Sequence, residues 1–266
     1  MDISSFLGII SGIGLIILGI RMLTPNFMFF VSLSSFLIVA GGSFAATLLS
    51  FSMKEVFGLS KSILAVFKKR EFKLPKLVDE IVDLAPLARR SMQELEKSLS
   101  DVTDYFLRDG IQMVVEGYNP NDIRDILETR IANRNSREQA EANVLTTMGK
   151  YSPAFGMIGT LIGLVVMLFG MANISSGGED PMAVLGGGMG TALITTFYGT
   201  ILANLIFNPM AEKFESRIEK RVSQQTMLID GIILLHDRKH PLIVREKLNS
   251  YLRPTDWKKP EEAGKK

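Results

Sequence analysis

The stretch Tyr151–Gly178, YSPAFGMIGTLIGLVVMLFGMANISSGG, runs for 28 residues without an Asp, Glu, Lys or Arg. About 20 apolar residues are enough for a helix to cross a bilayer. Three further stretches share this property: Ile3–Ile20, Phe27–Ser52 and Met182–Met210. Whole-chain averages of 47% hydrophobic and 22% charged residues, with a net charge of +2, hide this segregation. The pattern predicts an all-α, polytopic membrane protein with four transmembrane helices and a helical cytoplasmic domain.

The basic residues predict how these spans are oriented. Of the 30 Lys and Arg residues, sixteen lie in residues 53–150 and thirteen follow Met210, which leaves only Arg21. Basic residues mark the cytoplasmic side of a membrane protein. We therefore expect both termini and the long loop in the cytoplasm, and the connections Arg21–Asn26 and Ser176–Pro181 on the opposite side.

Four segments follow from this topology. They are transmembrane helices 1 and 2 (1–52), a large cytoplasmic helical loop (53–149), transmembrane helices 3 and 4 (150–210) and a cytoplasmic helical tail (211–266). The spans themselves are predicted at Ile3–Leu23, Phe27–Phe51, Lys150–Asn173 and Met182–Phe207.

Within the loop, Leu74–Arg137 is expected to fold as a compact helical domain. Its apolar residues recur at helical spacing, and the recurring positions are Ile81, Leu84, Leu87, Ala88, Ile123, Ile126, Leu127 and Ile131. Gly117 is suited to the end of one helix, and Asn119-Pro120-Asn121-Asp122 to the start of the next. No strong stop follows before Pro153, so one long helix is expected to run from Pro120 into the third span, kinked near Pro153.

The segment Phe57–Phe72 alternates apolar residues with lysines and an arginine. This pattern is typical of a basic amphipathic helix on the inner leaflet. An ordinary first helix of the cytoplasmic domain would have the same pattern, and the residues favour neither interpretation.

Missing residue types argue against an enzyme. The chain has no Cys, its two histidines, His236 and His240, lie in the charged tail, and it has no glycine-rich phosphate loop. A catalytic triad, a metal site and a tightly bound cofactor are therefore not expected. Nucleic acid is not an expected partner either, because acids interleave with the bases and membrane sidedness explains the basic excess.

Small residues form one face on each of the last two spans. Pro153, Gly156, Thr160 and Gly163 share a stripe of the third span, and Ala192, Thr196, Gly199 and Ala203 share a stripe of the fourth. Such faces let another helix approach closely. The glycines could serve packing within this chain, and each threonine could bond back to its own helix carbonyl.

A path for a small cation is the functional interpretation of the two hydroxyls, Thr160 and Thr196. A cation crossing hydrocarbon needs compensating charge, yet none of the four spans contains a carboxylate. If this chain conducts ions, a partner helix must therefore supply an Asp or Glu.

Several motifs occur in the order found in one known family. They are SFLIVAGG (35–42), LARR (87–90), VEG (115–117) followed by IR (123–124), PAFGMIGT (153–160), TTFYG (195–199) and NP (208–209). Over residues 1–254 the chain thereby resembles the MotA/PomA stator subunits of the bacterial flagellar motor, within the wider MotA/TolQ/ExbB family. The resemblance implies a homopentamer in the bacterial inner membrane around two copies of a MotB/PomB-like subunit. That partner has one span with an essential Asp, and the assembly turns ion flow into force on the rotor switch protein FliG.

The resemblance also implies roles for individual residues. Pro153 and Pro209 match prolines that couple ion binding to movement, whereas the alternative is a static kink or, for Pro209, a helix end. Gly156, Gly163, Ala192 and Gly199 would pack against the partner helix.

Rotor contact is the role implied for Arg89 and Arg90, with Glu96, and also Glu94, as the acidic counterparts. Arg89 and Glu96 are seven apart and are expected to share a helix face. Arg90 and Glu94 have the spacing of an ordinary helix ion pair, which is the alternative interpretation.

The transported ion is expected to be Na⁺, with H⁺ as the alternative. Sodium-type members resemble Met-Ile-Gly-Thr at residues 157–160, and sodium needs several oxygen ligands once it sheds water. Ser32 departs from those sodium-type relatives that have an acidic residue at this place. Two other functions remain open: a TolQ/ExbB-like energiser of envelope processes, and a membrane scaffold that conducts nothing.

Overall fold

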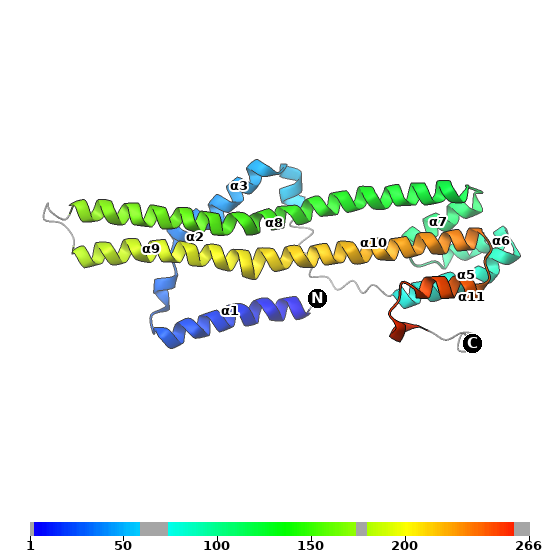
Figure 1. Cartoon of the computed structure of the whole chain (residues 1–266), viewed down its shortest axis with the longest axis horizontal. Coiled ribbons are helices and arrows are strands. Elements are labelled where there is room, and N and C mark those ends of the chain that lie inside the picture. The colour runs from blue at the N-terminus through cyan, green and yellow to red at the C-terminus, as the bar shows by residue number, and fades with distance from the viewer. Residues whose placement is uncertain (1–2, 59–73, 174–179, 258–266) are drawn as a thin grey trace. The chain divides into compact units, whose positions relative to one another are not determined.

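The computed structural model describes residues 3–58, 74–173 and 180–257, and these residues contain helices and no strands (Figure 1). The predicted amphipathic segment Phe57–Phe72 lies almost wholly outside them. The chain divides into two compact units. Unit 1 comprises Met1–Lys69 and Gln139–Glu215, and unit 2 comprises Arg70–Glu138 and Ser216–Lys266.

Unit 1 contains the apolar helices. They are α1 (Ile3–Leu23), the second stretch (Phe27–Ser50), the later part of α8 (Pro120–Asn173), α9 (Pro181–Ile201), the π-helical η5 (Leu202–Phe207) and the start of α10 (Asn208–His236). Among the residues that the structure describes, three helices are long and apolar enough to cross a membrane: the second stretch, the helix that contains α8, and the helix from α9 into α10. Within α1, the apolar part Leu7–Leu23 is shorter.

The second stretch is not the continuous α-helix that the sequence predicts. A 3-10 turn, η1 (Phe27–Phe30), is followed by extended backbone at Val31 and Ser32, and then by α2 (Leu33–Phe36), the π-helical η2 (Leu37–Gly41) and α3 (Gly42–Ser50). The Ser32 side chain caps α2 by accepting from the Ser35 amide at 3.3 Å.

A tyrosine from α9 closes this break. The Tyr198 hydroxyl donates to the Phe30 carbonyl at 2.6 Å and accepts from the Ser32 amide at 3.1 Å. Phe197 packs edge-on against Phe30, with ring centroids 5.8 Å apart. Unpaired backbone groups are costly in an apolar environment. The interruption therefore persists because Tyr198 satisfies the groups that the helix leaves open.

Unit 2 is a helical bundle around one apolar core. Its elements are α5 (Leu74–Arg90), α6 (Met92–Lys97), η3 (Ser98–Ser100), α7 (Tyr105–Val115), the first part of α8, the later part of α10, α11 (Pro241–Asn249) and η6 (Pro254–Asp256). The predicted core positions Ile81, Leu84, Ala88, Ile123, Leu127 and Ile131 are buried, and Leu87 and Ile126 pack against them. The helical spacing is thereby confirmed.

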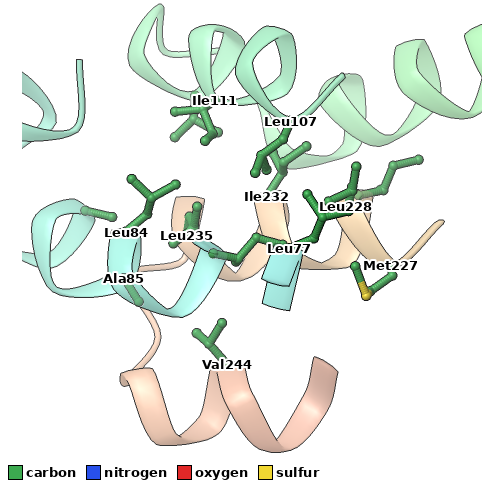
Figure 2. Packing of buried hydrophobic residues seen from close by; sticks show 14 of the residues in the cluster. Leu77, Leu84, Ala85, Leu107, Ile111, Met227, Leu228, Ile232, Leu235 and Val244 are labelled. Carbon is green, nitrogen blue, oxygen red and sulfur yellow. The ribbon is translucent and has the colours of Figure 1, made fainter. Parts of the chain in front are cut away.

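The C-terminal helices complete this core (Figure 2). Leu228, Ile232 and Leu235 of α10 and Val244 of α11 are almost completely buried among the side chains of α5 and α7. Without these two helices the apolar faces of α5 and α7 would have too few neighbours, so the region after residue 216 belongs to the same folding unit.

The long helix begins where the sequence predicts. Gly117 adopts φ +82°, which ends the preceding helix, and the Asn119 side chain accepts from the Asn121 amide at 3.1 Å. From Pro120 a single helix then continues to Asn173 with Pro153 inside it, as expected. The ends of both helices follow from these local signals alone.

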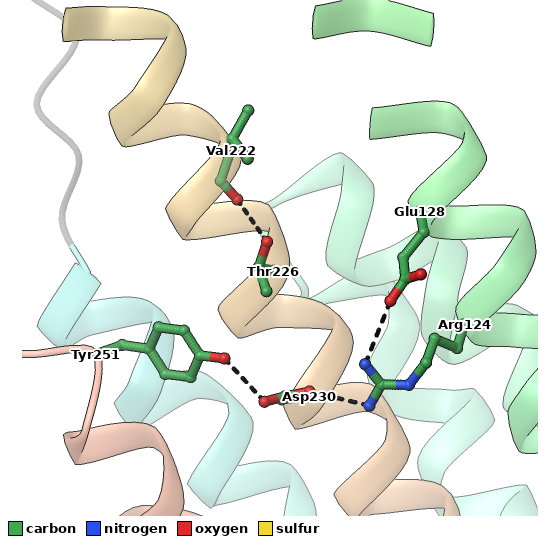
Figure 3. A network of polar contacts seen from close by, with 6 residues as sticks. All are labelled: Arg124, Glu128, Val222, Thr226, Asp230 and Tyr251. Atoms are coloured by element: carbon green, nitrogen blue, oxygen red, sulfur yellow. Dashed lines mark hydrogen bonds and ion pairs between the residues drawn. The ribbon is translucent and has the colours of Figure 1, made fainter. Parts of the chain in front are cut away.

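A partly buried carboxylate links three parts of unit 2 (Figure 3). Asp230 of α10 accepts from Arg124 of α8 at 3.0 Å and from the Tyr251 hydroxyl at 2.9 Å. Arg124 also donates to Glu128, and Thr226 donates to the Val222 carbonyl within α10. Burial and the bond to Asp230 raise the pKa of Tyr251, and the same carboxylate raises the pKa of Arg124.

Candidate functional site

The predicted small-residue faces of α8 and α9 meet within this chain. These two helices run side by side (Figure 1), and a Cβ added at Gly156 would lie 3.1 Å from the Thr195 carbonyl oxygen. A Cβ at Gly199 would lie 2.5 Å from the Ser152 carbonyl oxygen, and one at Gly163 would lie 2.8 Å from the Ala192 amide nitrogen. The glycines implied by the resemblance as partner contacts are therefore occupied by packing inside the chain, which was the alternative interpretation.

Two further glycines, Gly159 and Gly188, belong to this contact, although the sequence analysis did not predict them. A Cβ at Gly159 would lie 2.5 Å from Thr195, and one at Gly188 would lie 3.0 Å from the Gly163 carbonyl oxygen. The buried line consists of Gly188, Ala192, Thr195 and Gly199 of α9 and Ala203 of η5. Its small residues recur every three or four positions, and this spacing, rather than the presence of glycine alone, was the available signal.

The two predicted hydroxyls lie at the edge of this contact and face one another. Thr160 Oγ1 is 2.6 Å from Thr196 Oγ1, 3.0 Å from the Ala192 carbonyl oxygen and 3.1 Å from the Gly156 carbonyl oxygen. Thr160 is half-buried and Thr196 is exposed on the surface of the chain. Since two hydroxyls have only two protons, their oxygens keep lone pairs that can face a ligand or a partner helix.

A polar stripe continues from Thr196 along the same helix. Thr200, Asn204 and Asn208 follow at intervals of four. Thr200 donates to the Thr196 carbonyl at 2.9 Å, Asn204 to the Thr200 carbonyl at 3.2 Å, and the Asn208 amide to Asn204 Oδ1 at 3.4 Å. Thr196, Thr200 and Asn204 are all exposed in the chain. This stripe was also missed from the sequence, although the four-residue spacing of amides and hydroxyls in an apolar span was visible.

The helix continues through Pro209, so the interpretation of Pro209 as a helix end is wrong. Pro209 is the second residue of α10, and the π-helical η5 comes immediately before it. Proline provides no amide hydrogen and crowds the preceding turn, and the wider π turn absorbs both effects. Gly149 of α8 leaves room for the Asn208 amide, because a Cβ there would overlap Asn208 Oδ1. Pro153 lies inside α8 and is half-buried.

The charged residues of α5 and α6 do not form one helical face. Arg89 and Arg90 are the last residues of α5, and Ser91 has extended backbone before α6 begins. Arg89 and Glu96 therefore lie on different helices, and the expectation that they share a face is wrong. The missed signal is Ser-x-x-Glu at residues 91–94, a capping pattern in which Ser91 accepts from the Glu94 amide at 3.2 Å.

Arg89, Arg90 and Glu96 are nevertheless exposed, and Glu94 is half-buried. Arg90 pairs with Glu94 at 3.9 Å, as its spacing predicts, and both side chains are largely open to solvent. An exposed pair of this kind adds little stability. The charges are thus available to a partner surface.

Among the described residues, no group of three His, Cys, Asp or Glu side chains could hold a metal ion. The oxygens near Thr160 and Thr196 come from hydroxyls and backbone carbonyls, which are hard ligands. Any charge on a permeating cation must therefore be balanced from outside this group.

Comparison with known proteins places the chain in a family. Residues 98–227 match the model of the MotA/TolQ/ExbB proton channel family. The chain is 33% identical over 256 residues to the chemotaxis protein PomA of Vibrio alginolyticus, covering 95% of this chain and 96% of the relative. It is 31% identical over 262 residues to motility protein A of Treponema phagedenis, covering 98% of both.

Solved structures of MotAB proteins have the same fold as this chain. The flagellar MotAB stator complex of Bacillus subtilis has a subunit that superimposes with a TM-score of 0.86 at 27% identity, over 96% of this chain and 98% of that one. C. jejuni MotAB has the same fold, with a TM-score of 0.86 at 24% identity over 96% and 97% of the two chains. The resemblance inferred from the ordered motifs is confirmed. The chain belongs to the MotA/TolQ/ExbB family, among the MotA and PomA proteins.

Proposed function

We propose that this chain is the ion-conducting stator subunit of a bacterial flagellar motor, and that it works with a MotB/PomB-like subunit. The observation that carries the proposal is the hydroxyl pair Thr160–Thr196. The two oxygens are 2.6 Å apart and lie on two apolar spans, residues 151–178 and 182–210, that contain no carboxylate. The similar MotAB structures support a MotB partner, and we propose that the single span of this partner brings the missing Asp. Ion flow past that Asp would drive stepping of the complex.

The proposed topology has four spans in the bacterial inner membrane, with both termini cytoplasmic. The distribution of basic residues supports it, since all but Arg21 lie on the side assigned to the cytoplasm. The proposed assembly is a homopentamer around two partner helices.

The ion route that we propose continues past the hydroxyl pair along the polar stripe. Thr200, Asn204 and Asn208 provide an oxygen or amide at each helical turn between Thr196 and Pro209. An exposed amide facing lipid would be costly. A partner helix or a hydrated path beside the stripe removes that cost.

Sodium is the proposed ion. The Thr160 hydroxyl oxygen lies within 3.0 Å of two other oxygens, the Thr196 hydroxyl and the Ala192 carbonyl. Several oxygens thus converge where the partner carboxylate would approach. A dehydrated sodium ion needs such a set, whereas a proton needs only the titrating carboxylate.

Force transmission is assigned to two further sets of residues. Pro153 and Pro209 with the adjoining π turn are the proposed hinges, because each proline removes one helix hydrogen bond and the π turn widens the helix. Arg89, Arg90, Glu94 and Glu96 are the proposed contacts with FliG, since their side chains gather at the α5–α6 corner with weak internal pairing.

The test replaces the Thr160 side chain with one that lacks the hydroxyl and with one that keeps it. Swimming speed is measured against external sodium at fixed proton-motive force for wild type, Thr160→Ala and Thr160→Ser. Thr191→Ala is the matched control, because Thr191 lies on α9 but bonds only to its own helix at Gly187. We expect Thr160→Ala to raise the sodium needed for half-maximal speed, and Ser and the control to leave it nearly unchanged.

Three results would reject this proposal or parts of it. Full speed of the wild type in sodium-free medium rejects sodium as the ion. An unaltered sodium dependence in Thr160→Ala shows that Thr160 only packs. If the chain forms no complex with a single-span subunit that carries an Asp, the stator function itself is rejected.

A further inference from the structure

Unit 2 contains a basic pocket between α7, α8 and α10 that the ion path does not use. Its volume is about 600 Å³, within the usual range for small-molecule sites. The residues that matter here are Arg130, Arg134 and Arg137 of α8, Arg221 and Gln225 of α10, and Tyr105 of α7. We call this set the arginine pocket.

The three arginines of α8 lie on one face because they are spaced at four and three residues. Arg130 pairs with Asp109, while Arg134 and Arg221 share the single carboxylate of Glu138. Arg137 has no acidic partner among the residues that the structure describes. Guanidinium groups thus outnumber the carboxylates that pair with them.

Gln225 provides the pocket with an amide that no other described side chain uses. Its side chain is only 5% exposed, yet no hydrogen-bond partner for its amide exists among the described residues. It lines the pocket one helical turn beyond Arg221. Its amide atoms are not among the buried atoms that lack a partner, so they reach the solvent of the pocket. A group in the pocket can therefore both accept from and donate to this amide.

Tyr105 adds an aromatic surface. It is the first residue of α7 and is 78% exposed, so its ring is open to a ligand. Aromatic rings beside arginines are the usual support for flat heterocycles. Arginine itself binds phosphate through two parallel hydrogen bonds.

We propose that the arginine pocket binds a nucleotide-type ligand. The phosphates would contact Arg137 and Arg134, the heterocycle would stack on Tyr105, and its polar edge would face the Gln225 amide. Because every one of these residues lies in unit 2, the proposal is independent of the ion path. It gives the cytoplasmic domain a site through which a soluble metabolite can affect the protein.

The experiment measures binding to the purified full-length chain in complex with its partner subunit, at fixed salt. ATP and GTP are the nucleotide probes, pyrophosphate represents the phosphates alone, and adenosine represents the ring alone. Isothermal titration gives the Kd, and the shift of the thermal midpoint gives a second readout. We expect a nucleotide to bind at least about tenfold more tightly than either fragment.

Arg137→Gln is the decisive variant, because removing an unpaired arginine leaves no carboxylate orphaned. We expect it to weaken nucleotide binding at least about tenfold, the loss typical of one charge-assisted hydrogen bond. Arg238→Gln, on an exposed arginine just after α10, is the control and should leave Kd within about twofold of wild type. Gln225→Leu should lose affinity for the nucleotide but not for pyrophosphate.

Four outcomes would overturn the proposal. They are no nucleotide binding at millimolar concentration, equal binding of pyrophosphate and nucleotide, an equal loss in Arg137→Gln and Arg238→Gln, and undiminished nucleotide affinity in Gln225→Leu. Loss of rotor recruitment in Arg137→Gln without any nucleotide binding would assign the pocket to an acidic protein segment instead.

Discussion

Gly199→Ala is the substitution whose effect follows most directly from the geometry. The new methyl group would be 2.5 Å from the Ser152 carbonyl oxygen and 3.2 Å from the Cα atoms of Gly156 and Pro153. All three are backbone atoms, so no side chain can rotate away. The only relief is a movement of α9 away from α8.

The magnitude is a difference of two terms. Alanine gains about 1 kcal/mol over glycine inside a helix. Overpacking costs about 1–3 kcal/mol, and contacts with rigid backbone belong at the upper end. We expect a net loss of about 2 kcal/mol in the free energy of unfolding, or roughly 4–8 °C in Tm for a protein of this size.

Gly190→Ala is the matched control. It is the same change in the same helix, but a Cβ at Gly190 has nothing within 4 Å. It should gain up to about 1 kcal/mol, so the two variants should differ by about 3 kcal/mol.

The assay is thermal unfolding of the purified stator complex in detergent, with sodium-dependent swimming speed as the second readout. Movement of α9 also separates Thr160 from Thr196, now 2.6 Å apart, so speed should fall with stability. A Gly199→Ala protein as stable as Gly190→Ala would refute the close packing of α8 and α9.

Three further substitutions test other parts of the fold by thermal unfolding. Tyr198→Phe removes the hydroxyl that satisfies Ser32 and Phe30 and should cost about 1–3 kcal/mol; unchanged stability would mean that the break at Ser32 needs no support. Ser91→Ala removes the cap of α6 and should cost about 1 kcal/mol, whereas Ser91→Thr should retain most of it; equal losses in both would contradict the capping role. The pKa of Tyr251 is raised in the folded state. Its neutral hydroxyl therefore contributes fully to the free energy of unfolding below the ordinary tyrosine pKa of 10.0, and this contribution is lost as the pH rises through the folded-state pKa. The stability of Tyr251→Phe should therefore fall less between pH 9 and 12 than that of wild type, and parallel pH curves would contradict this assignment.

Helix ends and core faces that depend on residues close in sequence could be predicted from the sequence. The start of α8 at Asn119-Pro120 and the end of α7 before Gly117 depend on caps and backbone freedom a few residues away. The helical spacing of Ile81, Leu84 and Ala88 identified a core face in the same way. The break at Ser91 had an equally local signal, and the Ser-x-x-Glu pattern was simply missed.

Other features depend on distant residues and were not predictable from a window of sequence. The break at Val31 and Ser32 exists because Tyr198, 166 residues later, satisfies the open backbone. Helix continuity through Pro209 depends on the π turn before it. The C-terminal helices entered the core of unit 2 although their sequence resembles an exposed, charged tail.

The packing of the glycines between α8 and α9 limits where a partner helix can approach. The buried line Gly156, Gly163, Ala192 and Gly199 is occupied by the other helix of the same chain, and one face cannot serve two helices. If a partner helix brings the carboxylate, it must therefore approach the exposed line beside it, which begins at Thr196 and continues through Thr200 and Asn204. Packing and ion handling are then separate tasks of adjacent faces. The glycines set the spacing between α8 and α9, and that spacing holds the two hydroxyls together at the surface where the missing charge would arrive.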